Sequence, residues 1–217
     1  MVDIEKYLLS VEMPIQYMGN EVNSIHKKEF KANMCLFFPD IYEVGMSNLG
    51  IRILYDILNK VDGFSLERGF SPLEDMEALM REKKIPMFSL ESKTPLKEFD
   101  VVGFSLSYEM SYTNVLNALD LAGIPIRSED RGEEYPLIMA GGTCTVNPVP
   151  MSRFIDYFVI GDGEDVMPEI ARIFVDNPDK TNVGKLELIR GLDGVYIPKL
   201  DKDKRIKKAI VHNLDST

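Results

Sequence analysis

Two short apolar runs in the segment from Tyr135 to Ile170 each end in glycines. The run 137–140 stops at Gly141-Gly142, and the run 156–160 stops at the Gly-Asp-Gly-Glu turn of residues 161–164, after which apolar residues recur at helical spacing. Strands that are buried on both faces of a parallel sheet read as unbroken apolar runs, and ligands bind such sheets beyond the carboxyl ends of the strands. The segment therefore predicts two parallel strands that lead into a glycine-lined crevice.

Three further apolar runs, 34–38, 64–69 and 100–106, supply the other strands of the expected sheet. Asn48 is placed to cap the helix after the first run, and the sequence Ser-Pro-Leu-Glu of residues 71–74 has the pattern of a capping box. Five strands that alternate with helices predict a flavodoxin-like, Rossmann-like doubly wound parallel sheet in the order 2-1-3-4-5. The expected parts are an N-terminal extension (1–33), the α/β domain (34–177) and a C-terminal extension or linker (178–217).

The charge balance limits the expected partners. The chain has 25 basic and 35 acidic residues, a net charge of -10 and a pI near 4.8, which argues against a nucleic acid or an anionic membrane surface as its partner. The basic cluster 202–208 is expected to be a solvated tail. No signal peptide is visible and no apolar stretch approaches the roughly 18 residues of a membrane span, so we expect a cytoplasmic protein with reduced thiols.

Several kinds of catalytic or metal site are missing from the sequence. The two cysteines, Cys35 and Cys144, are too few for a thiolate metal centre and are expected to be small buried side chains. The loop after the first strand contains only Gly45 and Gly50, so it lacks the G-x-G-x-x-G dinucleotide fingerprint. No nucleophile is paired with a base. The sequence predicts no catalytic residue and no metal ligand within this chain.

What the sequence offers instead is a set of turns at the ends of the strands. In the order 2-1-3-4-5 the first and third strands are neighbours, so their following turns should face one crevice beside the turn of the fourth strand. Taken singly, these residues also fit plain roles, because aspartate and glycine are common in tight turns and serine satisfies backbone groups at strand ends. The candidate ligand-binding residues are Asp40, Tyr42, Gly45, Ser105, Ser107, Gly141, Gly142, Thr143, Gly161, Asp162, Gly163 and Glu164.

The three turns resemble those of the cobalamin-binding domain, whose pattern is D-x-H-x-x-G, then S-x-L, then G-G. In that family the histidine is the lower axial ligand of cobalt, the serine reaches the nucleotide tail and the paired glycines open the slot for that tail. Tyr42 stands at the histidine position and Ser107 at the leucine position. The resemblance implies cobalamin as a cofactor held without an axial histidine, because a neutral phenol is a poor cobalt ligand. The matching residues are Asp40, Gly45, Ser105, Gly141 and Gly142.

A narrower resemblance covers most of residues 8–217. It is to the N-terminal region of cobalamin-binding-type radical SAM proteins, in which this domain precedes a barrel whose C-x-x-x-C-x-x-C motif holds a 4Fe-4S cluster that works with S-adenosylmethionine. This chain has no such motif. The resemblance implies that the chain positions a corrin or a substrate for a radical SAM barrel, in the parent chain or in a separate subunit, and that the cluster and S-adenosylmethionine belong to that barrel. The runs that carry it are PDIYEVGMSNLGIRILYDIL, SYEMSYTNVLNALDLAGIP, AGGTCTVNPVP and FVIGDGEDVMPEI.

Two other functions stay open at this point. The slot could be empty, and the domain would then act as an interaction or substrate-recruiting module for its barrel, which Tyr42 and Ser107 favour because they depart from the cobalamin pattern. Alternatively, the crevice could bind a different small molecule, such as a nucleotide.

Overall fold

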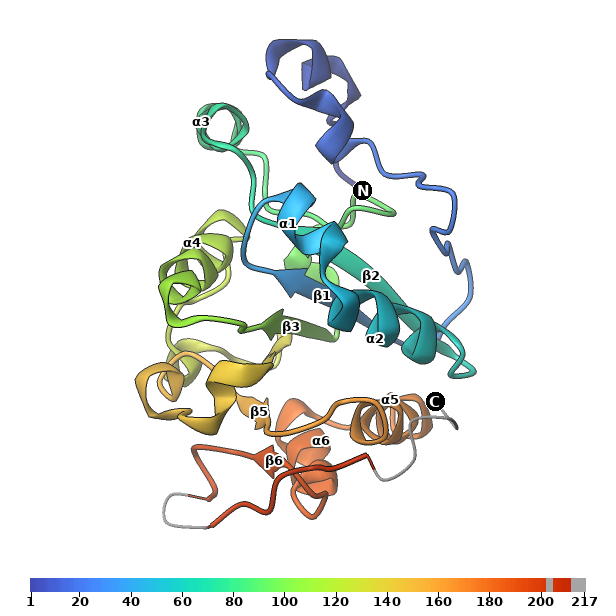
Figure 1. Ribbon diagram of the computed structural model, residues 1–217, viewed down its shortest axis with the longest axis vertical. Helices are drawn as coiled ribbons and strands as arrows, with labels where there is room; N and C mark the ends of the chain where they lie inside the picture. Colours follow the sequence, from blue (N-terminus) through green and yellow to red (C-terminus); the bar gives the residue numbers. More distant parts are fainter. Residues whose placement is uncertain (202–204, 212–217) are drawn as a thin grey trace.

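A six-stranded sheet in the order β2-β1-β3-β4-β5-β6 forms the centre of the computed structural model, which describes residues 1–201 and 205–211 (Figure 1). The first five strands are parallel, and β6 pairs antiparallel with β5. The predicted α/β class and the order 2-1-3-4-5 are confirmed for the parallel strands, but the predicted count of five is wrong. The strands are β1 (Ala32–Phe38), β2 (Phe64–Phe70), β3 (Val101–Ser105), β4 (Leu137–Gly141), β5 (Tyr157–Val159) and β6 (Val195–Tyr196).

Helices lie on both faces of the sheet, as a doubly wound fold requires. The α-helices are α1 (Tyr42–Ser47), α2 (Leu49–Asn59), α3 (Glu74–Lys83), α4 (Tyr112–Leu121), α5 (Val166–Asp176) and α6 (Asn182–Ile189). Short 3-10 helices span Glu5–Ser10, Pro14–Tyr17, Leu96–Glu98, Glu109–Ser111, Ser128–Asp130, Thr143–Val146 and Val149–Met151.

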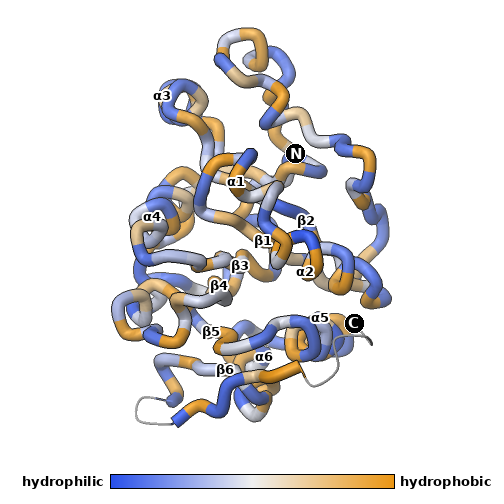
Figure 2. Tube along the Cα trace, viewed as in Figure 1, coloured by the Kyte–Doolittle hydropathy of each residue, from blue (hydrophilic) through white to orange (hydrophobic). Residues whose placement is uncertain are grey.

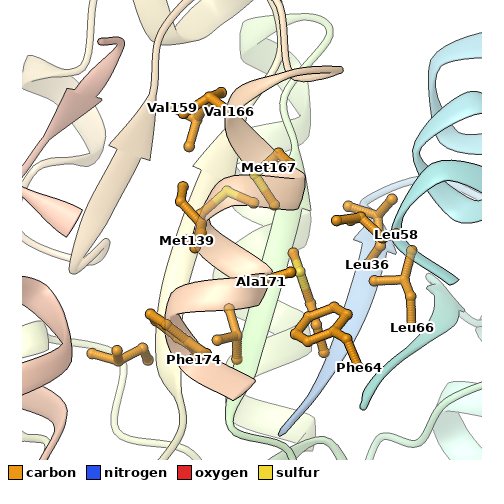
Figure 3. Close-up of a cluster of buried hydrophobic side chains, with 14 of the residues drawn as sticks. Leu36, Leu58, Phe64, Leu66, Met139, Val159, Val166, Met167, Ala171 and Phe174 are labelled. Carbon is orange, nitrogen blue, oxygen red and sulfur yellow. The ribbon is translucent and has the colours of Figure 1, made fainter. Parts of the chain in front are cut away.

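Alternate residues of the strands contribute side chains to two hydrophobic cores, one on each face of the sheet. On one face Leu36 and Met139 pack with α2 and α5, whereas on the other face Phe37 and Phe104 pack with α3 and α4. Figure 3 shows the first of these cores, with Met167 of α5 lying next to Met139 of β4. The helices α2 and α5 therefore share one face of the sheet, and the space between their N-terminal ends lies above the carboxyl ends of the strands.

The start of α3 differs from its prediction. The helix begins at Glu74 without a side-chain cap, and the preceding Leu73 is extended. Two long-range hydrogen bonds hold this segment out of the helix, because the Ser71 N–H donates to the carbonyl of Asp40 (2.9 Å) and the Leu73 N–H donates to the Tyr17 hydroxyl (3.0 Å). The predicted capping box is therefore wrong.

The cap of α2 is confirmed. The Asn48 side chain accepts a hydrogen bond from the backbone N–H of Ile51 at 3.1 Å. The loop expected between β1 and α2 is itself partly helical, because it contains α1.

The segments on either side of the predicted domain both pack against it. The N-terminal residues run past β2 before β1 begins, and Glu21 there pairs with Arg68 of β2 (Figure 1). The predicted C-terminal extension contributes α6 to the core and β6 to the sheet. Of the basic cluster expected to be a solvated tail, 202–204 lie outside the described residues. Within the described ranges, no helix is both long enough and apolar enough to cross a membrane.

After β6 the chain returns to the sheet edge as an extended segment, residues 205–211, which we call the strap. Ala209 of the strap forms a parallel β-bridge with Gly161, directly after β5. The Ala209 N–H donates to the carbonyl of Ile160 (2.9 Å), and the Asp162 N–H donates to the carbonyl of Ala209 (3.0 Å). The strap thus extends the carboxyl-end turn of β5 with a piece of chain that is distant in sequence.

Candidate functional site

A cavity of about 710 Å³ opens at the carboxyl edge of the sheet, between the N-terminal parts of α2 and α5. Its apolar walls come from Leu36 of β1, Leu54 of α2, Met139 of β4 and Met167 of α5. Its rim comes from the end of β3 and from the turns that follow β4 and β5, and the strap lines it as well. The cavity therefore combines an apolar interior with a rim of backbone and small polar side chains, which is the usual make-up of a small-molecule site.

The turns after β3 and β4 are joined to each other beside this cavity. The Leu106 N–H donates to the carbonyl of Gly141 (2.7 Å), and the Thr143 hydroxyl donates to the carbonyl of Ser107 (2.8 Å). Ser105, Gly141, Gly142 and Thr143 line the cavity, whereas Ser107 does not. The structure thus brings together most of the residues predicted on these two turns.

Glycine is found at positions 141 and 142 for two different structural reasons. Gly142 has a φ of +98°, and a Cβ there would lie 2.7 Å from the carbonyl oxygen of Leu106, so only glycine fits. Gly141 has an ordinary φ, and the nearest atom to an added Cβ would be 3.9 Å away, at the carbonyl oxygen of Val159. Gly142 therefore serves the turn itself, whereas the absence of a side chain at Gly141 leaves space at the cavity.

The turn after β5 gives the cavity its acidic groups. Gly161, Asp162, Gly163 and Glu164 all line it. The Asp162 carboxylate accepts a hydrogen bond from the backbone N–H of Val211 at 3.1 Å. A Cβ at Gly163 would lie 3.3 Å from the side chain of Leu54, so this glycine lets the turn approach α2 closely.

Sequence reasoning missed the remaining wall. Gly50 and Leu54 of α2, Tyr196 of β6, and Ile206 and Lys208 of the strap also line the cavity. Leu54 was visible only as part of the apolar stripe of a helix, and the strap residues carry no local signal, because a pairing across some 50 positions brings them here. Lys208 is the one basic side chain among the described lining residues, where it faces the same space as the two acids.

The turn after β1 does not line the cavity, although it meets the turn after β3, as expected for neighbouring strands. The Asp40 carboxylate accepts hydrogen bonds from the N–H of Ile41 (2.8 Å) and from the hydroxyl of Tyr108. A Cβ at Gly45 would lie 2.3 Å from the ring of Phe70, so this glycine is needed for packing against the end of β2. Asp40 and Gly45 thus have structural partners of their own.

Tyr42, at the position of the axial histidine in the cobalamin pattern, is likewise turned away. Its ring packs edge-on against Phe70 with ring centroids 5.5 Å apart, and its hydroxyl donates to Glu21 at 3.1 Å. Burial, with the neighbouring carboxylate of Glu21, raises the pKa of Tyr42 to about 12. The phenol is neutral at physiological pH and engaged elsewhere.

The described residues offer no obvious metal centre. No group of three or more histidine, cysteine, aspartate or glutamate side chains is arranged to hold a metal ion in the described ranges. Burial raises the pKa of the Cys35 thiol well above its ordinary value and also raises that of Cys144. Both cysteines are therefore protonated and buried, as the sequence predicted for small apolar side chains.

Comparison with known proteins gives two matches. The family model for the N-terminal part of radical SAM proteins matches residues 50–198, a range that includes the turns after β3, β4 and β5. An uncharacterized protein of Methanocaldococcus jannaschii is 24% identical over 175 residues, which cover 79% of this chain and 30% of the relative. The chain thus spans about 30% of the length of that relative. No solved structure matches.

Proposed function

Because the chain belongs to the family of N-terminal domains of radical SAM proteins, we propose that it is a cobalamin-binding module that positions a corrin for a radical SAM domain. The observation that carries this proposal is the cavity between α2 and α5. It lies at the carboxyl edge of a doubly wound parallel sheet, where such folds bind nucleotide-like ligands.

The cavity suits the nucleotide tail of a corrin. Its volume of about 710 Å³ is in the range of small-molecule sites, and Met139 and Met167 give it adaptable apolar walls against which a planar aromatic base can pack. Ser105 and Thr143 supply hydroxyl groups at the rim. Gly141 leaves the entrance free of a side chain. The residues of this chain would bind and orient the tail, and they would exclude water from it.

The same cavity offers cobalt no histidine, since none of the described residues lining it is one. Tyr42 does not line the cavity, and its hydroxyl donates a hydrogen bond to Glu21. We therefore propose that this chain would hold the corrin through its nucleotide tail and would supply no histidine to its cobalt. Cobalamin supplies the redox and alkyl-transfer chemistry of its cobalt when it is bound. The chain itself holds and presents the cofactor.

Exposed apolar side chains lie in the segments that follow β1, β3 and β4, at the carboxyl edge of the sheet, and support the placement of the corrin and the radical SAM domain at this edge. Leu49, Met110, Val146 and Val149 are 66%, 84%, 75% and 72% exposed. Figure 2 shows apolar residues along the exposed loop between β4 and β5. Apolar groups that gather at one edge of a domain mark interaction sites more often than chance. The 4Fe-4S cluster and S-adenosylmethionine would belong to the domain that covers this edge.

Two alternatives are distinguished by the same experiment. An interaction module with an empty slot is favoured by the Tyr108–Asp40 hydrogen bond, which bridges the turns after β1 and β3. A nucleotide that carries several phosphate groups is disfavoured, because Lys208 is the one basic side chain among the described lining residues, whereas Asp162 and Glu164 would repel each added phosphate.

The direct test mixes the protein with hydroxocobalamin, removes the excess by gel filtration and records the spectrum. We expect one equivalent of corrin to be retained with a base-off absorbance shift. The Tyr42→Phe variant is the matched control, and its spectrum should be the same, since the phenol does not reach the cavity. Absence of retained corrin would overturn the proposal. Retention of a nucleotide without corrin would favour the second alternative.

A further inference from the structure

The strap lines the cavity although it is distant in sequence from most of the other lining segments. Ile206 and Lys208 line the cavity, and the neighbouring Lys207 pairs instead with Asp193 at 2.5 Å. Ala209 is buried and belongs to the same core cluster as the apolar residues of α5. The strap thus alternates as an extended chain does, because Ile206 and Lys208 line the cavity whereas Lys207 and Ala209 do not.

The domain is shaped to receive this backbone. Gly161 has a φ of +109°, and a Cβ there would lie 2.2 Å from the carbonyl oxygen of Ala209. Gly194 has a φ of +82°, and a Cβ there would lie 2.9 Å from the Cβ of Ala209. Both glycines allow the strap to lie directly on the ends of β5 and β6. The docked position is therefore a specific one.

Among the described residues, few interactions hold the strap in that position. They include the two hydrogen bonds between Ala209 and the turn after β5, the bond from the Gly194 N–H to the carbonyl of Lys207 (2.7 Å), and the bond from Val211 to Asp162 (3.1 Å). Ala209 is its one buried side chain in the described part. A segment with so little buried apolar surface opens at a lower free-energy cost than the strands of the core. The strap can therefore leave the domain while the sheet stays folded.

We propose that the strap is the retaining element of the ligand site: it docks over the bound ligand through Ile206 and Lys208, and the ligand leaves only after the strap undocks. The identity of the ligand rests on the proposed function. Lys208 is suited to a single anionic group, such as the phosphodiester of a nucleotide tail, because it is the one basic side chain among the described lining residues. A ligand that contacts the docked strap shifts the equilibrium toward docking.

The test compares the rates at which two proline variants release bound hydroxocobalamin after dilution, measured by stopped-flow absorbance of the corrin. Ala209→Pro removes the N–H that bonds to Ile160 and should speed release roughly tenfold with little effect on binding rate. Ile210→Pro is the matched control, because Ile210 is 46% exposed and its N–H has no partner among the described residues. Its release rate should stay within about twofold of the natural protein. Equal unfolding midpoints in urea show that both variants fold.

Hydrogen exchange supplies a readout that needs no ligand. In the free protein, the amides of Ala209 and Val211 should exchange well before those of β4, and hydroxocobalamin should protect them. Exchange of the strap as slow as that of β4 would overturn the proposal.

The outcomes separate the two proposals. If corrin is retained but Ala209→Pro releases it at the natural rate, the strap proposal fails and the proposed function stands. If corrin is not retained, the proposed function fails, and the release measurement is repeated with 8-anilinonaphthalene-1-sulfonate, an anionic aromatic probe. An unchanged release rate for this probe, or a failure of the probe to bind, then overturns the strap proposal as well.

Discussion

The hydroxyl of Tyr108 donates a hydrogen bond to the carboxylate of Asp40, and this bond joins the turn after β3 to the turn after β1. A second bond, from the Asn114 side chain to the carbonyl of Pro39 (2.9 Å), joins the same two regions. These two hydrogen bonds therefore bridge the carboxyl ends of β1 and β3, where the strand order reverses. The cavity opens beside it, toward β4 and β5.

Tyr108→Phe should lower the free energy of unfolding by at most about 1 kcal/mol, because Tyr108 is partly exposed and the bond competes with water. Corrin affinity should stay within about twofold, since neither Tyr108 nor Asp40 lines the cavity. Urea unfolding and equilibrium dialysis measure the two quantities. Tyr7→Phe is the control, because the Tyr7 hydroxyl has no hydrogen-bond partner within the described ranges. A loss of corrin binding in Tyr108→Phe would indicate that the ligand binds in the crevice between β1 and β3 instead.

Tyr42 should make stability fall at alkaline pH. Its pKa is raised from 10.0 to about 12 in the folded protein, first by burial and then by Glu21. A raised pKa stabilises the folded state fully below the unfolded pKa of about 10, and this contribution is lost as the pH rises through about 12. The difference in unfolding free energy between the natural protein and Tyr42→Phe should shrink across that window. Urea unfolding on both sides of the window tests this, and a constant difference would contradict it.

Arg68 holds the N-terminal segment to β2 through a buried ion pair. Its guanidinium bonds to Glu91 at 2.6 Å and to Glu21 at 3.1 Å, and the side chain of Glu91 is fully buried. Arg68→Met should cost about 3–5 kcal/mol, because it leaves the Glu91 carboxylate buried without its partner. The double variant with Glu91→Met should lose less than Arg68→Met alone. A double variant as unstable as the single one would show that the uncompensated charge is not the cause.

The strands could be predicted because each central strand is a run of contiguous apolar residues. Met34–Phe38 and Val101–Ser105 are apolar runs buried on both faces, and β4 reads the same way. The sequence allows a strand at 194–197, where β6 lies, but β6 is two residues long and pairs antiparallel with β5, so the pattern did not assign it to the sheet. Long-range hydrogen bonds from the backbone N–H groups of Ser71 and Leu73 to Asp40 and Tyr17 also decide the start of α3, against a local capping pattern.

The candidate site was predictable to the extent that it depends on glycines at strand ends. Ser105 and the glycines after β4 and β5 lie where the pattern placed them, at the carboxyl edge of the sheet. Asp40 and Tyr42 share the pattern but not the cavity, because packing on Phe70 and a bond to Tyr108 decide their orientation. The strap wall depends on the Gly161–Ala209 bridge, which no local sequence period encodes.

The central claim is that a corrin tail occupies the cavity between α2 and α5, and substitution of Gly141 tests it most directly. A side chain there meets no atom closer than 3.9 Å at its Cβ and lies at the cavity, whereas any side chain at Gly142 strains the turn itself. Gly141→Ala is the matched control for Gly141→Leu. In equilibrium dialysis with hydroxocobalamin, the account predicts that Gly141→Leu weakens binding by roughly a hundredfold, or about 2.7 kcal/mol, with its unfolding free energy nearly unchanged. Natural affinity in a folded Gly141→Leu variant would contradict the account.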